Sequence, residues 1–237
     1  METILNLGLN DRSVQGLAAS VKNERFAYDA YRRFVQMYSS VVMELPKEDL
    51  EHRLRAMKEK LGVKDDTAVP ASGWKELVAE YKAFFREKTG KDFPEDPIEQ
   101  LWGAVGAVFG SWMAEKAVTY RRVEKITGLL GTAVNVVQMV FGNTGDNSGT
   151  GVCFTRNPSS GEKVFYGDYL VNAQGEDVVA GIRTPMHLTE MKKIMSKVYG
   201  QLEKVREKLE HHYQDMQDME FTVEDGTLYM LLSLIHI

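Results

Sequence analysis

The sequence is poor in the residues and segments that would indicate several classes of protein. It has one cysteine, Cys153, in 237 residues, which excludes a disulfide within the chain. Cys153 stands between Val152 and Phe154 in an apolar run, where a buried core residue is expected rather than a nucleophile. No apolar run approaches the roughly 20 residues needed to span a bilayer, and no charged-then-apolar leader opens the chain. We therefore expect no membrane partner and a cytoplasmic location.

An excess of basic charge is also absent. The chain has 29 Lys and Arg residues against 34 Asp and Glu residues, which gives a formal net charge of -5. These charges are spread along the sequence, so we expect no nucleic-acid partner, whereas ATP needs only a local positive patch. His52, His211 and His212 have no partners at metal-ligand spacing, and no catalytic histidine can be named.

The first part of the chain has the apolar spacing of helices. From residue 11 to residue 86 apolar side chains recur every three or four positions, as at Phe26, Ala30, Phe34, Met37 and Val41. The pattern predicts a helix ending near Pro46, a second over residues 47–61 closed by Gly62, and a third over residues 72–89. Ser72 or Gly73 is expected to cap this third helix and Gly90 to end it. Pro94 and Pro97 then mark a boundary.

The pattern changes after residue 97. A helix with small packing residues is expected over residues 101–124, followed by a strand over residues 132–142 that is rich in β-branched residues. Further strands are expected at residues 151–155, 164–170 and 221–229, with a long helix over residues 188–212. This mixture predicts an α+β or α/β lobe beside a helical subdomain.

Residues 142–185 form the most informative segment. Ser148, Gly149, Thr150 and Gly151 combine small residues with two hydroxyls, and such a segment could donate N–H and O–H hydrogen bonds to a terminal phosphate. The alternative is an ordinary hairpin between two strands. The segment is not a Walker loop, since no Gly-Lys-Ser/Thr follows, and not a dinucleotide fingerprint, since a strand comes next. Residues 138–140 could border an adenine ring or form a buried strand.

Two carboxylates near the end of the sequence suggest a metal site. Asp218 and Glu220 stand two apart in DMEFTVEDGTLYML, which reads as a hairpin that turns at Asp225 and Gly226. Alternate residues of a strand share a face, so the two carboxylates could hold a Mg²⁺ ion that bridges phosphate oxygens. The alternative is an exposed acidic face.

Four segments together carry a family resemblance: METILNLGLND, SGTGVCFTRNP, NAQGEDVVAGIRTP and DMEFTVEDGTLYML. Over residues 1–231 they resemble the N-terminal ATP-grasp nucleotide-binding domain of pyruvate, phosphate dikinases, with phosphoenolpyruvate synthases as the nearest competitors. The resemblance implies an α+β fold in which an ATP-grasp-like lobe, with a mixed sheet and helices, follows an all-helical subdomain. It implies these parts: 1–10, a remnant of the first ATP-grasp lobe; 11–97, the helical subdomain; 98–231, the ATP-grasp α/β lobe; 232–237, an aberrant tail.

The resemblance also implies an activity. Such enzymes interconvert ATP, phosphate and pyruvate with AMP, diphosphate and phosphoenolpyruvate, through a phosphohistidine on a swivelling domain that lies outside this chain. Two more implied partners are the phosphoenolpyruvate/pyruvate domain of the intact enzyme and a second subunit of a homodimer. The implied roles are adenine contact for Gln138, Met139 and Val140, contact with the terminal phosphates for Thr150 and Gly151, lining of the nucleotide site for Glu176 and Asp177, and Mg²⁺ binding for Asp218 and Glu220.

Two departures from the family pattern qualify the expected activity. The first lobe, with its basic nucleotide-binding residues, has no counterpart before Met1, and Leu232, Ser233 and Leu234 stand where the family has Gln-Thr-Arg. We therefore expect a truncated fragment that does not catalyse the reaction alone. A non-catalytic binding module that uses its helical subdomain as a partner surface is the alternative.

Overall fold

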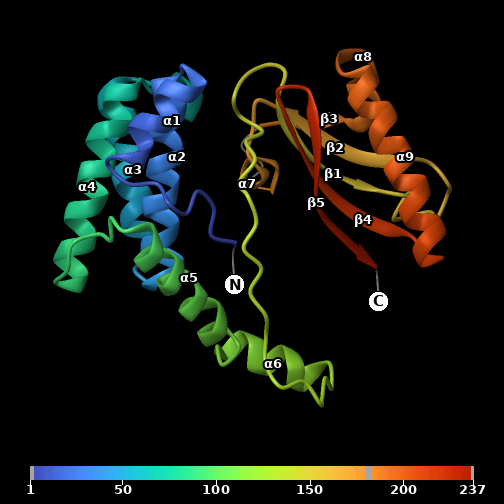
Figure 1. Ribbon diagram of the computed structural model, residues 1–237, viewed down its shortest axis with the longest axis horizontal. Coiled ribbons are helices and arrows are strands. Elements are labelled where there is room, and N and C mark those ends of the chain that lie inside the picture. The colour runs from blue at the N-terminus through green and yellow to red at the C-terminus, as the bar shows by residue number, and fades with distance from the viewer. Residues whose placement is uncertain (1–2, 180–182, 236–237) are drawn as a thin grey trace. The chain divides into compact units, whose positions relative to one another are not determined.

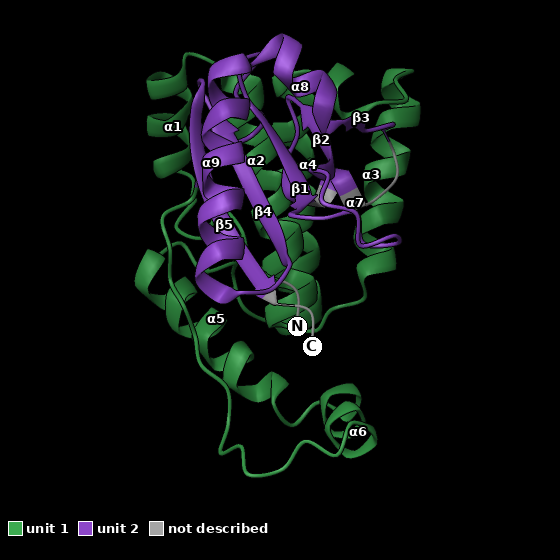
Figure 2. Ribbon diagram, turned by 90° about the vertical axis from the view of Figure 1, so that its right-hand side faces the viewer, with its two compact units in different colours: residues 1–139 green, residues 140–237 purple. Residues whose placement is uncertain are grey.

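The chain divides into two compact units, residues 1–139 and residues 140–237 (Figure 2). The computed structural model describes residues 3–179 and 183–235. The first unit is helical and the second contains a sheet, so the α+β class is confirmed. The sequence placed a domain boundary near residue 97, where helix α5 (Pro97–Ser111) begins. Within the described ranges, no helix is both long and apolar enough to cross a membrane.

Helices build the first unit (Figure 1), and the helical spacing expected between residues 11 and 86 is confirmed. The elements are α1 (Ser13–Val21), α2 (Glu24–Met37), the π-helical turn η1 (Tyr38–Val42), α3 (Lys47–Leu61), the 3₁₀ turn η2 (Asp66–Ala68), α4 (Ala71–Thr89), α5 and α6 (Glu115–Val123).

Short-range signals start and end several of these helices. The side chains of Asn23 and Asp96 accept main-chain hydrogen bonds at the starts of α2 and α5. Gly62 and Gly90 adopt left-handed backbone, with φ of 67° and 71°, directly after α3 and α4. Both glycine stops were expected, because glycine adopts this conformation without a steric penalty.

Two helix boundaries differ from those expected. Helix α4 begins at Ala71, after Pro70, so the cap predicted at Ser72 or Gly73 is wrong. The single helix expected over residues 101–124 is two helices, α5 and α6, separated by a turn that begins at Trp112. Arg121 of α6 donates a 2.8 Å hydrogen bond to the Trp112 carbonyl, which stabilises this turn.

The core of the first unit lies around α2, which packs against α1 and α4. Its largest fully buried side chains are Phe26, Tyr31, Phe34, Leu50, Trp74, Leu77 and Tyr81. One ionic network is buried beside them. Arg32 forms ion pairs with Asp29 at 2.5 Å and with Asp66 at 3.0 Å, and its guanidinium lies 4.5 Å from the Trp74 ring centroid.

The prediction of a strand at residues 132–142 is wrong. Residues 129–141 have no regular secondary structure, and Leu130, Val136 and Val137 are 103%, 68% and 81% exposed. A strand needs a neighbour to pair its main-chain N–H and C=O groups. None of the described strands pairs with this segment, so its β-branched residues do not by themselves produce a strand.

The second unit is built on a five-stranded sheet in the order β3-β2-β1-β4-β5. The strands are β1 (Gly149–Phe154), β2 (Tyr166–Val171), β3 (Met186–His187), β4 (Gln217–Glu224) and β5 (Thr227–Ile235). The strands expected at 151–155 and 164–170 are confirmed as β1 and β2. Each described pairing is antiparallel, whereas a mixed sheet was expected.

The hairpin between β4 and β5 turns where the sequence predicted. Asp225 and Gly226 both have positive φ, of 47° and 75°, as a type I′ turn requires. This turn fixes the register in which Thr222 faces Tyr229 and Glu224 faces Thr227.

Helices cover one face of this sheet. The long helix expected over residues 188–212 is two helices, α8 (Leu188–Ile194) and α9 (Ser196–Tyr213), because the backbone leaves helical geometry at Met195, with φ of -133° and ψ of 58°. The apolar core between helices and sheet comprises Cys153, Phe165, Tyr169, Leu188, Met191, Val198, Tyr199, Leu202, Met219, Phe221 and Val223. A short helix, α7 (Gly175–Val179), contacts β1 and lies on the other side of the sheet from α9 (Figure 1).

Candidate functional site

The sheet face that points away from α8 and α9 carries polar side chains among apolar ones. Because directly paired residues point to the same side, the register of β1, β2 and β4 assigns this face. Its polar members are Thr150, Asp168, Asp218, Glu220, Thr222 and Glu224. We call this surface the carboxylate face. It is the candidate site, because it holds three of the residues predicted from sequence.

Asp218 and Glu220 lie side by side on this face, as their spacing predicted. Asp218 is half-buried and Glu220 is exposed, and neither has an ion-pair partner among the residues that the structure describes. On β1 they face Phe154 and Val152, and on β5 they face Leu234 and Leu232. The neighbouring strands therefore place apolar side chains, and no cation, directly opposite the two carboxylates.

This donor set suits a Mg²⁺ ion that also binds phosphate. The nearest other carboxylate in register, Asp168, is two strands from Glu220, which is about 10 Å. No group of three or more potential metal ligands occurs in the described part of the chain. Mg²⁺ is commonly bound by one or two carboxylates plus substrate phosphates and waters. Asp218 and Glu220 fit that arrangement, and they do not form a closed protein cage.

Thr150 belongs to the same face but is not free to bind. It is 3% exposed, and its hydroxyl donates a 3.1 Å hydrogen bond to the Phe221 carbonyl. Its oxygen also lies 3.3 Å from the Thr222 hydroxyl. In the register of β1 and β4, Glu220 is a diagonal neighbour of Thr150. The fold therefore brings Thr150 near one of the predicted metal ligands, while its hydroxyl is already engaged.

Gly151 points to the opposite, apolar face. It is paired with Tyr169 on β2 and Phe221 on β4, whose rings stack with centroids 6.2 Å apart and planes 9° apart. A Cβ at Gly151 would lie 2.6 Å from the Phe221 ring and 2.6 Å from the Asp168 carbonyl oxygen. A Cβ at Gly149 would lie 2.5 Å from the Tyr169 ring. Both glycines leave space for aromatic rings in the core.

The turn before β1 is held by main-chain and hydroxyl contacts. Ser148 is fully buried, and its hydroxyl lies 2.6 Å from that of Thr144 and accepts a 3.0 Å hydrogen bond from the Asp225 N–H. The Ser148 carbonyl accepts from Asn172 N–H at 2.8 Å. Ser148 thus joins the glycine-rich turn to the end of β2 and to the β4–β5 hairpin. Residues 142–147 form turns, but no described strand precedes them, so the alternative of a hairpin between two strands is wrong.

The residues around α7 are fixed by a capping arrangement. The Asp177 carboxylate accepts a 2.9 Å hydrogen bond from the Gln174 N–H, and the Asp177 N–H donates to the Gln174 carbonyl at 3.0 Å. The Gln174 side-chain amide donates to the Asn143 side chain at 3.2 Å. The side chain of Glu176, the other residue predicted here, lies outside what the structure describes. Arg183 binds the carbonyls of Val171 and Asn172.

The three residues proposed to border adenine are divided between the units. Gln138 and Met139 end the first unit and Val140 begins the second. Gln138 is exposed, and the other two are half-buried. None lies in a strand, so the alternative of a buried strand is wrong for them.

Sequence reasoning missed two residues of the second unit that bear on the site, and it named Ser148 without its structural role. Thr222 and Glu224 continue the alternation of Asp218 and Glu220 along β4, a signal that was present in the sequence. Burial raises the pKa of Glu224, although a hydrogen bond with the Phe141 main chain counters part of this effect. The role of Ser148 carried no local signal, because its partners are distant in sequence.

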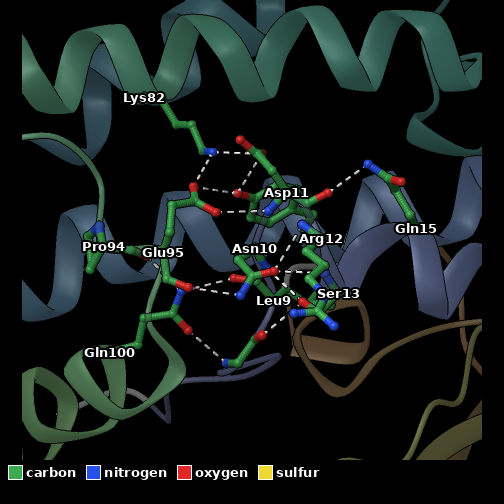
Figure 3. Close-up of polar contacts among 12 residues, drawn as sticks. Leu9, Asn10, Asp11, Arg12, Ser13, Gln15, Lys82, Pro94, Glu95 and Gln100 are labelled. Atoms are coloured by element: carbon green, nitrogen blue, oxygen red, sulfur yellow. Dashed lines mark hydrogen bonds and ion pairs between the residues drawn. The ribbon is translucent and has the colours of Figure 1, made fainter.

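Another polar cluster, in the first unit, has a structural role (Figure 3). Lys82 forms ion pairs with Asp11, at 2.7 Å, and with Glu95. The Tyr31 hydroxyl donates to both carboxylates, and burial together with these charges raises its pKa strongly. The buried Gln100 side chain donates to the carbonyls of Leu9 and Pro94 and accepts from Gly8 N–H. These contacts attach the N-terminal segment to α4 and α5.

A surface hollow of about 480 Å³ in the second unit lies apart from the predicted site. Arg156, Lys163 and Glu210 line it together with residues from the end of α9. Glu210 binds Arg156 at 2.8 Å and Lys163 at 3.4 Å, so these charges largely neutralise one another. The hollow contains none of the residues predicted from sequence, so the carboxylate face is the candidate site.

Comparison with known proteins gives one family over most of the chain. The family described as "Pyruvate phosphate dikinase, AMP/ATP-binding domain" matches residues 1–199. The chain is 57% identical over 232 residues to a pyruvate, phosphate dikinase of Clostridium symbiosum, covering 98% of this chain and 26% of that protein. It is 56% identical over 231 residues to the chloroplastic pyruvate, phosphate dikinase 1 of Arabidopsis thaliana, with coverages of 98% and 24%. A Rhizobium meliloti (strain 1021) pyruvate, phosphate dikinase is 52% identical over 243 residues, with coverages of 98% and 27%. The chain thus spans about a quarter of the length of these relatives.

Proposed function

The chain belongs to the family of pyruvate, phosphate dikinase AMP/ATP-binding domains, and from this premise we propose that it is the MgATP-binding part of a dikinase. The supporting observation is identity of 52–57% with three named dikinases over 98% of the chain. In the whole enzyme the proposed reaction converts ATP, phosphate and pyruvate to AMP, diphosphate and phosphoenolpyruvate. The phosphohistidine that carries the phosphoryl group belongs, in this proposal, to another domain.

The carboxylate face is the proposed position of the polyphosphate. Asp218 and Glu220 would hold Mg²⁺ from β4, and the ion would neutralise phosphate charge during transfer. Their support is the shared face, the absence of a competing ion pair in the described residues and the diagonal position of Thr150. In-line phosphoryl transfer depends mainly on positioning and charge neutralisation, so rigid strand carboxylates suit it.

The remaining assignments complete the proposed nucleotide site. Asp177 would line the nucleotide site from the start of α7, where its carboxylate already caps the helix. Residues 138–140 would contact adenine, and Thr150 and Gly151 would approach the terminal phosphates through their main chain, since the Thr150 hydroxyl is engaged. The homodimer and the cytoplasmic location stay predictions, and several plant relatives are named chloroplastic.

A chimera tests the proposal. Residues 3–231 of this chain would replace the matching segment of the Clostridium symbiosum enzyme, and we expect the chimera to form phosphoenolpyruvate from ATP, phosphate and pyruvate. Glu220→Gln in the chimera should lower kcat about 100-fold, because one charge that stabilises the transferred group through the metal is lost. Glu207→Gln, an exposed carboxylate on α9, is the matched control and should leave kcat unchanged.

The isolated 237-residue chain gives a separate outcome. We expect no formation of phosphoenolpyruvate by it, because the phosphohistidine lies elsewhere in this proposal. If the chimera folds and binds pyruvate but Glu220→Gln behaves like Glu207→Gln, the proposed metal role of Glu220 is wrong. If the chimera forms no phosphoenolpyruvate, the assignment of the chain to the ATP half-reaction is wrong.

A further inference from the structure

Glu224 is the last residue of β4, and its carboxylate reaches a main-chain group outside the sheet. The Phe141 N–H donates a hydrogen bond to this carboxylate. The turn that follows Glu224 is tied to the glycine-rich segment, because the Asp225 N–H donates to the Ser148 hydroxyl at 3.0 Å. Glu224 is therefore a firmly held acceptor at the end of the sheet.

Phe141 stands directly after the segment proposed to border adenine. Residues 138–140 have no regular secondary structure, and no main-chain hydrogen bond joins them to another described residue. On the other side of Phe141 the chain is fixed, because the Gly142 carbonyl accepts from the Ala173 N–H at 2.9 Å and a Cβ at Gly142 would overlap the Ala173 carbonyl oxygen. Glu224 thus holds the peptide at which the fixed part of the second unit begins.

The geometry of a peptide extends this contact to the Val140 carbonyl. The Phe141 N–H and the Val140 C=O belong to one planar trans peptide, in which they point in opposite directions. A carboxylate that holds the N–H therefore directs the Val140 carbonyl away from Glu224. A carbonyl can accept from the N6 amino group of adenine, whereas guanine presents the O6 acceptor at the same position of its ring.

We propose that Glu224 is a positioning residue that makes this site select adenine, by fixing the peptide between Val140 and Phe141. This role rests on the proposed function, in which residues 138–140 border the base. The Glu224 carboxylate itself does not touch the nucleotide. Without this carboxylate the peptide is free to rotate, and an N–H turned towards the base would suit the O6 of guanine. Loss of Glu224 therefore weakens the binding of ATP and reduces its advantage over GTP.

Metal binding does not fit Glu224. It lies four residues beyond Glu220 in β4, which is about 13 Å along the strand, so the two carboxylates cannot share one ion. Its carboxylate already accepts from Phe141, and burial raises its pKa, which disfavours the charged form that a metal requires. The separation suits a nucleotide whose base and metal-bound phosphates lie at its two ends.

Two substitutions of Glu224 and one control separate this role from general stability. Glu224→Ala removes the acceptor, whereas Glu224→Gln keeps a side-chain carbonyl that can accept from the Phe141 N–H. Glu203→Ala is the matched control, because Glu203 is also half-buried in the second unit and accepts a hydrogen bond from the Tyr199 hydroxyl. It belongs to α9, which covers the opposite face of the sheet. Glu224→Thr, a good strand former with too short a side chain, replaces Glu224→Ala if circular dichroism shows loss of fold.

Hydrogen exchange of the Phe141 amide in the isolated chain tests the contact without any assumption about function. We expect this amide to exchange about three- to tenfold faster in Glu224→Ala, because one hydrogen bond is lost. Glu224→Gln and Glu203→Ala should keep the protection of the unmodified chain. Equal exchange of this amide in all four proteins would overturn the proposal.

Equilibrium binding of MgATP and MgGTP to the chimera with the Clostridium symbiosum enzyme tests base selection. We expect Glu224→Ala to raise the dissociation constant for MgATP about three- to tenfold and to lower the preference for MgATP over MgGTP at least about threefold. At saturating ATP, kcat should stay within about twofold, because the base is remote from the transferred phosphoryl group. Glu224→Gln and Glu203→Ala should keep the preference of the unmodified chimera.

Failure of this role and failure of the proposed function give different results. If the chimera forms phosphoenolpyruvate and Glu224→Ala keeps the full preference for MgATP, base selection through Glu224 is wrong and the proposed function stands. An equal loss of affinity for both nucleotides would also refute the role, since a merely structural residue has that effect. If the chimera binds neither nucleotide, both are wrong.

Discussion

The substitution Gly151→Ala separates a packing role of the glycine-rich motif from a phosphate-binding role. A Cβ at residue 151 would lie 2.6 Å from both the Phe221 ring and the Asp168 carbonyl oxygen. The ring could shift, but the carbonyl belongs to the β1–β2 ladder and cannot move without loss of pairing. Overpacking costs about 1–3 kcal/mol, and a fixed main-chain neighbour favours the upper end. Alanine also restricts the unfolded chain, which offsets about 0.4–1 kcal/mol of this destabilisation.

We therefore expect Gly151→Ala to lower the free energy of unfolding of the second unit by about 2 kcal/mol. For a body of about 100 residues this corresponds to a fall in Tm of roughly 8–16 °C. Hydrogen exchange of amides in β1, β2 and β4 measures the effect locally. All three tryptophans, Trp74, Trp102 and Trp112, belong to the first unit, so tryptophan fluorescence reports that unit separately and should not change.

Gly200→Ala is the matched control in the same unit. Gly200 lies inside α9, and a Cβ there would meet no atom within 4 Å. Its replacement should stabilise the unit by about 0.5–1 kcal/mol, because alanine favours helix more than glycine does. If Gly151→Ala were as stable as the unmodified chain and lost only MgATP binding in the chimera, the packing argument would be refuted and the phosphate role favoured.

Two further predictions concern stability. Burial alone would raise the pKa of Asp66, but Arg32 and Lys58 lower it below the ordinary value of 3.8. The contribution of the Asp66 carboxylate to the stability of the first unit is therefore present above pH 3.8 and lost as pH falls through the folded pKa. Asp66→Asn should reduce this loss of stability in acid, as measured by urea unfolding followed by tryptophan fluorescence. Ser148→Ala should destabilise the second unit by about 0.5–1.5 kcal/mol, because the Asp225 N–H loses its acceptor, and faster hydrogen exchange at the β4–β5 turn checks it.

The elements that sequence predicted best depend on neighbours in the chain. The helix ends at Gly62 and Gly90 and the turn at Asp225 and Gly226 follow from left-handed backbone, which glycine adopts at little cost. The prediction of a strand at residues 132–142 is wrong for the opposite reason. Strand formation depends on a partner that a local pattern does not reveal, and no described strand pairs with this segment.

In the candidate site, too, features that depend on nearby residues were predictable, and features that depend on distant residues were not. The shared face of Asp218 and Glu220 follows from the two-residue period of a strand, and the structure has them in β4. The steric role of Gly151 could not be read from sequence, because it depends on Tyr169 and Phe221 meeting across β1. Small residues near a turn satisfy both a phosphate-binding and a packing interpretation until the cross-strand neighbours are known.

The charge of the carboxylate face limits how this unit could bind a polyphosphate. Asp168, Asp218, Glu220 and Glu224 all project from it, and none has an ion pair among the described residues. A polyphosphate approaching this face would meet only like charge, which is unfavourable without an intervening cation. Leu232 and Leu234 face two of these carboxylates, so β5 supplies no basic group there. On this face Mg²⁺ is therefore a condition of the proposed nucleotide binding, and further positive charge has to come from outside the sheet.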